Sequence, residues 1–511
     1  MGMRQWIAVF GSIIGAFMAV LDIQITSSSV LEITGGLAGT LDQGSWISTA
    51  YLIGEIIIIP LSGYLARVFS LRTYLMATSC LFLLFSFCCG LSWNMESLIV
   101  FRVLQGVTGG ALIPLAFQVM LMLPPDKRNV GMTLFAVTAT FAPAIGPTIG
   151  GYLTDTFHWQ ALFYINLVPG IFLLFAVSYG LDREVKRLDL LKNIDKWGVI
   201  TMAIGLSCLT VFLEEGQTKD WFGSTLICYL FVIAVISLSA FLYIELKSKN
   251  PFINLRLLKN RNFGLGSLVN FVGGMAMYGA LYLLPQYLAS VQRYDAAHIG
   301  QTMIWAGIPQ LFILPFLPLM MARFDTRWMA FTGLNLFGLS CIMNSHLTSL
   351  VGFDQLIWSQ IVRSIGQSIF MVPLITITTG TIQPEQAGSA SGLFNMLRNL
   401  GGSVGIAILS TMVSMREQFH SAKIGEGVSI LNIETQQRLL SYGELFLTKG
   451  YDLVTSAQKA TGLLDAAVRI QANVMAFNDC FLFVASALIL SSLLLLLCKK
   501  VSKKAGAAGA H

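Results

Sequence analysis

Long apolar runs alternate with short polar connections from residue 6 to residue 498. A helix needs roughly 20 apolar residues to cross the hydrocarbon core of a bilayer. Fourteen runs of this kind occur, at residues 6–27, 45–66, 73–92, 97–123, 130–153, 160–180, 197–214, 224–245, 263–288, 299–321, 328–347, 355–378, 387–414 and 472–498. The pattern therefore predicts an all-α membrane protein with fourteen transmembrane helices and with both termini on one side.

The lysines and arginines between the runs predict which side that is. Short loops rich in these residues stay in the cytoplasm. With the N-terminus inside, 21 of the 32 basic residues fall in cytoplasmic segments, and six of the eight outside lie in one long segment, 415–471. We expect a multi-pass protein of a bacterial inner membrane with both termini cytoplasmic.

Composition agrees with a membrane environment and excludes several other classes. Hydrophobic residues make up 55% of the 511 residues and charged residues only 11%, whereas soluble domains carry roughly a quarter charged residues. The net charge of +6 is spread thinly, which argues against a nucleic-acid partner. The eight cysteines lie inside apolar runs without metal-ligand spacing, so we expect no metal site. The sequence shows no catalytic constellation either, so we expect no catalytic residues and no enzyme activity.

Three arginines fall inside the apolar runs, where a charge is costly and usually marks a functional site. They are Arg102, Arg363 and Arg398. The sequences around Arg102 and Arg363 are similar, and in each the arginine is followed about three turns later by Pro-Leu. Parallel repeats of six helices are typical of major facilitator transporters. The repeat therefore predicts two six-helix bundles plus two inserted linker helices.

The predicted arrangement of helices divides the chain into four parts. They are an N-terminal bundle at 1–180, cytoplasmic linkers with the two extra helices at 181–262, a C-terminal bundle at 263–498 that includes a long periplasmic loop at 415–471, and a cytoplasmic tail at 499–511.

Three motifs carry a resemblance to a known family. They are GYLARVFSLR at 63–72, FRVLQGVTGG at 101–110 and GPTIGG at 146–151. Together with LEEGQTKDW at 213–221 and RNLGGSVGIA at 398–407, they resemble the EmrB/QacA subfamily of fourteen-span drug:proton antiporters in the major facilitator superfamily. The resemblance covers nearly the whole chain.

The motifs differ in what they imply. The loop motif contributes Gly63, Arg67 and Arg72, but Ala66 replaces the acid usual in the wider superfamily. The resemblance therefore does not imply a switch that uses that carboxylate. The antiporter motif contributes Gly146, Pro147, Gly150 and Gly151, where proline bends the helix and glycine permits close packing.

The resemblance implies an exporter of amphipathic or hydrophobic drugs that works by alternating access. It is driven by the proton gradient and needs no cofactor. It also implies two partners in a tripartite pump, a periplasmic membrane-fusion adaptor of the EmrA type and a TolC-type outer-membrane channel. The long periplasmic loop is the expected docking site.

Acids inside the predicted spans are the candidates for proton coupling. Asp22 in the first run is the leading proton carrier, Glu55 in the second is the reserve, and Arg102 biases the charge state of the carrier. A purely structural role is the alternative for each, but acids within a membrane mark proton relays by default.

A promiscuous cavity needs adaptable side chains. The candidates are Gln24, Phe17, Met18, Tyr278, Tyr282 and Arg398. With 34 phenylalanines and 21 methionines in the chain, contact with lipid is the alternative for the apolar members.

Two other functions remain open at this point. A selective exporter of fatty acids, siderophores or bile salts would share all of these motifs. A non-transporting membrane sensor would carry an added domain, and the sequence shows none.

Overall fold

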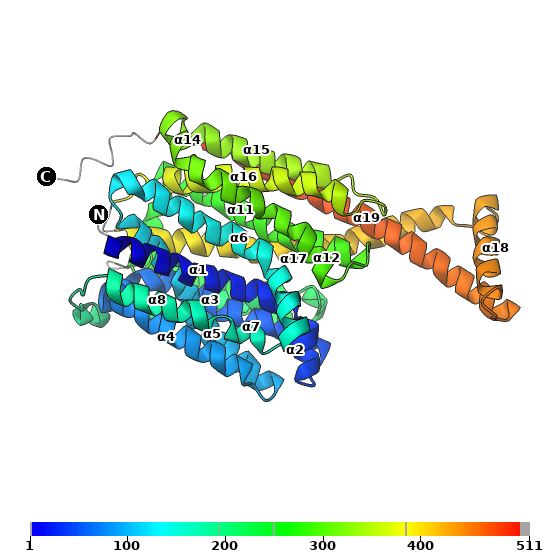
Figure 1. Ribbon diagram of the computed structural model, residues 1–511, viewed down its shortest axis with the longest axis horizontal. Helices are drawn as coiled ribbons and strands as arrows, with labels where there is room; N and C mark the ends of the chain where they lie inside the picture. Colours follow the sequence, from blue (N-terminus) through cyan, green and yellow to red (C-terminus); the bar gives the residue numbers. More distant parts are fainter. Residues whose placement is uncertain (1–2, 194, 249–250, 384–385, 501–511) are drawn as a thin grey trace.

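The computed structural model describes residues 3–193, 195–248, 251–383 and 386–500 (Figure 1). All regular secondary structure in these residues is helical. The N-terminal part contains α1 (Met3–Ser28), α2 (Val30–Gly36), α3 (Leu41–Phe69), α4 (Leu71–Gly90), α5 (Met95–Leu121), α6 (Pro125–Phe157), α7 (Ala161–Tyr164) and α8 (Leu167–Gly180). The middle part contains η1 (Leu188–Asn193), α9 (Lys196–Glu215), η2 (Trp221–Gly223), α10 (Thr225–Lys247) and η3 (Leu255–Lys259).

The C-terminal part is also helical. It contains α11 (Arg261–Ser290), α12 (Ala296–Met303), η4 (Ile304–Ala306), α13 (Ile308–Ile313), η5 (Leu314–Phe316), α14 (Leu317–Arg323), α15 (Thr326–Asn344), α16 (Phe353–Thr379), α17 (Ala387–Gly427), α18 (Ile433–Leu447) and α19 (Leu453–Leu496).

The predicted membrane spans correspond to helices. Among the described residues, twelve helical segments are long and apolar enough to cross a membrane. Helices α6 and α15 occupy the two remaining predicted spans, 130–153 and 328–347. The predicted all-α membrane architecture is therefore confirmed.

Two predicted spans are broken rather than continuous. Residues 160–180 form α7 and α8. Residues 299–321 form short α-helical and 3-10 pieces from α12 to α14. Pro309, Pro315 and Pro318 lie in this stretch. Each proline lacks a backbone N–H and crowds the preceding turn, so the apolar pattern is kept while the helix is interrupted.

Glycines allow the helices of the N-terminal bundle to approach closely. A Cβ atom added at Gly106 of α5 would lie 2.1 Å from the Tyr51 carbonyl oxygen of α3, and one at Gly54 would lie 2.3 Å from the Val103 carbonyl oxygen. Only glycine fits such backbone contacts. The buried polar residues of α3 and α5 therefore lie close together inside the N-terminal bundle.

The two halves meet along two seams. At the first, α3 lies against α17, where a Cβ at Gly63 would be 2.5 Å from the Gly388 carbonyl oxygen. At the second, α6 lies against α12, where a Cβ at Gly300 would be 2.5 Å from the Thr148 hydroxyl oxygen. Gly63 lies near the C-terminal end of α3 and Gly388 near the beginning of α17, whereas α12 lies toward the end of the bundle from which α18 projects (Figure 1).

The segment predicted as a long loop, 415–471, is mostly helical. Helix α17 continues to Gly427, α19 begins at Leu453, and α18 crosses between them. These helices project from the bundle at the end opposite both termini (Figure 1). At its base, Asp479 of α19 accepts hydrogen bonds from Arg416 at 2.5 Å and His420 at 2.8 Å, both from α17, so side chains across the stalk hold its two helices together.

Candidate functional site

Asp22 lies at the centre of a buried polar network in the N-terminal bundle. Its side chain, on α1, is 1% exposed and forms an ion pair with Nη1 of Arg102 on α5. Its Oδ1 accepts hydrogen bonds from Gln105 at 3.1 Å and from Asn166 at 2.7 Å. Both oxygens of the carboxyl group are therefore occupied by donors from other helices.

The arginine of this pair is also fully partnered. Arg102 is 0% exposed. Its Nε donates to the Ile47 carbonyl oxygen at 3.1 Å, its Nη1 to Gln105 at 2.9 Å and its Nη2 to the Thr26 hydroxyl at 3.1 Å. The guanidinium group lies 4.5 Å from the centre of the Tyr51 ring. A buried ion pair is tolerated when further hydrogen bonds satisfy both ions, and this pair meets that condition.

A break in the helix after α7 supplies one member of the network. Asn166 precedes α8 and is 2% exposed, and it also donates to the Ser86 hydroxyl at 3.0 Å. Sequence reasoning predicted Asp22 and Arg102 but did not assign roles to Gln105 or Asn166. The available signal was that both are polar residues inside predicted apolar runs, 97–123 and 160–180.

Glu55 forms a second site, between the bundles. It lies on α3, is 3% exposed, and its Oε1 accepts a hydrogen bond from Asn399 of α17 at 2.9 Å. Its Oε2 has no hydrogen-bond partner within the described part of the chain. Arg398 is close enough to interact electrostatically with Glu55.

Tyr51 lies between the two acidic sites. Its ring is fully buried, and its hydroxyl group interacts electrostatically with both Asp22 and Glu55. Arg102, which pairs with Asp22, also interacts electrostatically with Glu55. The structure thus brings together the three residues predicted for proton coupling around one aromatic side chain.

The antiporter motif packs directly against the helix that carries Asp22. A Cβ at Gly146 would lie 2.4 Å from Cβ of Gln24, two residues beyond Asp22. Pro147 is inside α6, and the Gly150 carbonyl oxygen accepts a hydrogen bond from Thr154 at 2.8 Å. Gly151 lies on the same helix. The motif therefore links α1 to the α6–α12 seam.

The loop motif lies at the opposite end of the seam from Glu55. Gly63 forms the close contact with Gly388. Arg67 lies 5.6 Å from the centre of the Tyr64 ring, and Arg72 donates to the Ser178 carbonyl oxygen at 2.7 Å. Each arginine therefore makes contacts within the N-terminal bundle, and Ala66 is buried beside them.

The predicted cavity residues lie on α1, α11 and α17 without forming one described cavity. Phe17 contacts Phe141 at 6.5 Å between ring centres, Met18 is buried, and the Tyr278 ring lies against Gly402. Tyr282 packs against the core, and Arg398 is buried next to Glu55.

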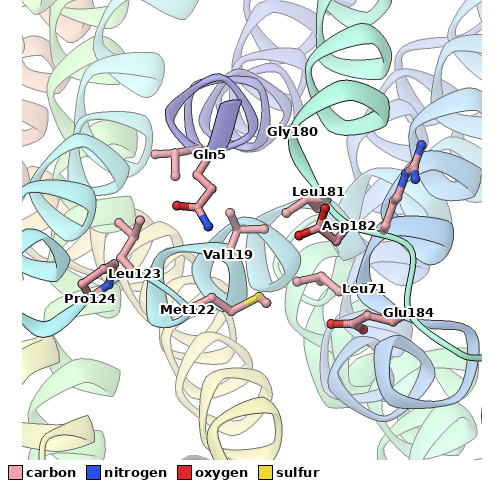
Figure 2. A pocket seen from close by; sticks show the side chains of 12 residues that line it. Gln5, Leu71, Val119, Met122, Leu123, Pro124, Gly180, Leu181, Asp182 and Glu184 are labelled. Atoms are coloured by element: carbon pink, nitrogen blue, oxygen red, sulfur yellow. The ribbon is translucent and has the colours of Figure 1, made fainter. Parts of the chain in front are cut away.

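Two of the cavities that the described residues form lie elsewhere. One of about 230 Å³ lies inside the N-terminal bundle near the chain termini, and Figure 2 shows Gln5, Asp182 and Glu184 at its edge with Leu71 and Met122. The other, of about 360 Å³, is an apolar crevice between the halves, lined by Val130, Thr133, Leu134, Leu311, Leu314, Pro315 and Pro318. The crevice lies along the seam between α6 and the segment from α13 to α14.

No group of three potential metal ligands occurs among the residues that the structure describes.

Comparisons with known proteins extend over most of the chain. The sequence profile of the Major Facilitator Superfamily matches residues 12–406. The chain is 35% identical to the colistin resistance protein EmrB of Acinetobacter baumannii over 492 residues, which cover 96% of this chain and 95% of the relative. It is 32% identical to the multidrug export protein EmrB of Escherichia coli K12, over 92% of this chain and 90% of the relative.

The chain is also similar to a third relative and to two solved structures. The fatty acid resistance protein FarB of Neisseria gonorrhoeae is 30% identical, over 92% of this chain and 91% of the relative. The human organic anion transporter MFSD10 has a TM-score of 0.61 at 13% identity, covering 97% of this chain and all of that one. A peptide transporter in complex with sulfate has a TM-score of 0.57 at 15% identity, covering 96% and 94%. At these identities the structures support the fold alone.

Proposed function

The chain belongs to the major facilitator superfamily, and on this basis we propose that it is a proton-coupled multidrug efflux transporter of a bacterial inner membrane. It exports amphipathic or hydrophobic compounds by alternating access of the two bundles. The names of two relatives, a multidrug export protein and a colistin resistance protein, support this substrate class.

The observation that carries the coupling proposal is the buried Asp22–Arg102 pair. Among the common charged side chains, a carboxyl group can gain and lose a proton in this setting, whereas arginine keeps its charge. Arg102 and Asp22 form a direct ion pair in the conformation described here. Movement of α5 relative to α1 would separate the two groups and allow Asp22 to take up a proton.

The proton gradient is sufficient for this work. A proton that moves inward across about 100 mV and one pH unit releases about 3.7 kcal/mol. That free energy supports a gradient of roughly several hundredfold for a neutral compound, so neither ATP nor a cofactor is required.

Transport assays in proteoliposomes test the function itself. Under an imposed pH gradient, we expect the purified protein to accumulate several structurally unrelated lipophilic compounds. The panel should include a fatty acid, because FarB is named for fatty acid resistance. Accumulation of the fatty acid alone would establish a selective exporter, and accumulation of no compound would contradict the proposal.

We further propose that both termini and the 182–196 linker lie in the cytoplasm and that the 415–471 projection lies outside. Lys186 and Ala422 are exposed on these two segments. With Lys186→Cys and Ala422→Cys introduced separately, an impermeant thiol reagent applied to intact spheroplasts should label Ala422→Cys above the level of the eight native cysteines and spare Lys186→Cys. The reverse labelling would place the termini outside.

The projection is the proposed docking surface for a periplasmic adaptor, which would connect the transporter to an outer-membrane channel. It exposes a set of large apolar side chains, which soluble surfaces rarely gather. They include Ile430, Leu431, Ile433, Leu440 and Leu453.

Removal of the projection should separate transport from resistance. We expect replacement of residues 424–463 by a Gly–Ser linker to abolish drug resistance in cells while gradient-driven accumulation in proteoliposomes is retained. The deletion keeps Arg416, His420 and Asp479, so the base of the stalk stays intact. Loss of both activities would instead assign the projection to the transport core.

A further inference from the structure

The first inserted helix, α9, is attached to both bundles. On the N-terminal side, Oε1 of Glu215 accepts hydrogen bonds from Ser45 at 2.7 Å and Thr49 at 3.5 Å, both on α3. On the C-terminal side, Nε1 of Trp221, just beyond α9, donates to the Thr411 hydroxyl of α17 at 3.1 Å. Helix α10, in contrast, is largely exposed. Helix α9 therefore lies across the α3–α17 seam and is more than a linker.

The preceding acid, Glu214, points toward α17. Its carboxyl group interacts with the Ser403 side chain, and its buried Oε1 has no hydrogen-bond partner among the residues described. Ser403 lies four residues beyond Asn399, so the two side chains occupy one face of α17 about one turn apart. Asn399 donates to Glu55. Two carboxyl groups from different helices thus contact successive turns of the same polar face.

The order of these acids along the membrane follows from the helix directions. Helix α3 begins at Leu41, at the end away from the termini, and Glu215 is held near that beginning by Ser45 and Thr49. Glu55 follows Thr49 by six residues, or about 9 Å along α3. Glu214 therefore lies nearer the outer end, and Glu55 lies deeper.

The carboxyl group of Glu55 is independent evidence that this polar face binds a proton. It is 97% buried, and its free Oε2 has no hydrogen-bond partner in the described ranges. A buried carboxyl oxygen without a donor is costly when charged, and the cost falls when it carries a proton.

We propose that Glu214 is a proton-binding site, contributed by the inserted helix, that passes protons between the outer side and Glu55. The inference rests on the proton coupling proposed above. In the inward step the O–H bond of protonated Glu214 breaks and an O–H bond forms at Oε2 of Glu55. The Ser403 hydroxyl can accept the proton of Glu214 while it donates its own to a water molecule, which in turn donates a proton to Oε2 of Glu55. Glu214 becomes a carboxylate and Glu55 becomes neutral.

The charged groups around Glu214 are consistent with this role. On the same segment, Glu215 interacts electrostatically with Glu214. The turn that follows carries Lys219 and Asp220. Helix α3 contributes Glu55, and α17 contributes Arg398, whose buried Nε is unpartnered in the described part of the chain. The charges of α10, Glu245 and Lys247, lie at its far end. Arg398 is thus the fixed cation next to Glu55.

Glu214→Gln in the full-length protein tests the proposal, with Glu245→Gln as the matched control. Glu245 is also a buried acid of the inserted pair, but it binds the Ile253 backbone N–H at 3.0 Å, far from the seam. We expect Glu214→Gln to lower gradient-driven accumulation in proteoliposomes by about tenfold or more and to flatten its pH dependence. Substrate counterflow, which needs no proton gradient, should persist. Glu245→Gln should behave as the unaltered protein in both assays.

A conservative variant keeps the test independent of folding. Glu214→Asp retains a titratable group, so it should recover part of the pH-dependent accumulation that Glu214→Gln loses. Accumulation by Glu214→Gln at the unaltered level would overturn the inference, as would loss of counterflow together with accumulation, because that pattern indicates a structural role. If the unaltered protein showed counterflow but no gradient-driven accumulation, the proposed coupling would fail, and this inference with it.

Discussion

Asp22→Asn is expected to abolish proton-driven efflux, lowering gradient-driven accumulation by about two orders of magnitude. Asparagine keeps the size of the side chain and an acceptor oxygen for Gln105 or Asn166, but it cannot titrate. Drug binding and counterflow should persist, since neither requires proton release. The measurement is accumulation of one established substrate in proteoliposomes, with and without an imposed pH difference.

The same substitution leaves Arg102 buried without its counter-ion. Breaking a buried pair by removal of one partner costs about 3–5 kcal/mol, so stability must be measured in parallel. The double variant Asp22→Asn/Arg102→Gln removes both charges and should recover thermal stability while remaining uncoupled. If Asp22→Asn still accumulated drug against a gradient, Asp22 would not be the carrier, and Glu55→Gln would become the decisive variant.

Gly63→Ala is expected to open the α3–α17 seam at the end that carries the termini. The new Cβ would lie 2.5 Å from the Gly388 carbonyl oxygen, and this contact between two backbones can be relieved only by separation of the helices. Overpacking of this kind costs about 1–3 kcal/mol, which shifts a two-state equilibrium by roughly 5-fold to 150-fold. Transport should fall because the protein is held in one state.

The reciprocal substitution is the matched control. A Cβ at Gly388 would lie 3.3 Å from the Gly63 carbonyl oxygen, a distance that a small adjustment accommodates. Spin labels at the exposed residues Lys186 and Gln383 should report a longer distance in Gly63→Ala and a nearly unchanged one in Gly388→Ala. An unchanged distance in Gly63→Ala would show that this contact does not close the seam.

The family resemblance predicted the antiporter motif at 146–151 but not what it touches. The contact of Gly146 with Gln24 and that of Thr148 with Gly300 join the motif to α1 and to α12. Glycine spacing indicates that helices approach closely, but it does not identify the partner helix. The same limit applies to the projection: its polar, helix-patterned sequence predicts a long insertion, but not that most of it continues α17 and α19.

The sequence by itself determined the membrane class, the places of the spans and the buried charges. Lipid offers the backbone no hydrogen bonds, so each span must satisfy its own as a helix, and the length of an apolar run is enough to locate it. Asp22, Glu55 and Arg102 stood out because charges are rare in such runs. Those conclusions depend only on residues near one another in the chain.

Only the tertiary structure decided which groups face each other. Asn166 reaches Asp22 from 144 residues away, and Asn399 reaches Glu55 from 344 residues away. The placement of Glu214 beside Ser403 depends on an inserted helix crossing a seam between two bundles. Helical periodicity predicts which residues share a face of one helix. The partner of that face is set by how the helices pack, because side-chain contacts between two helices depend on the relative positions of the helices.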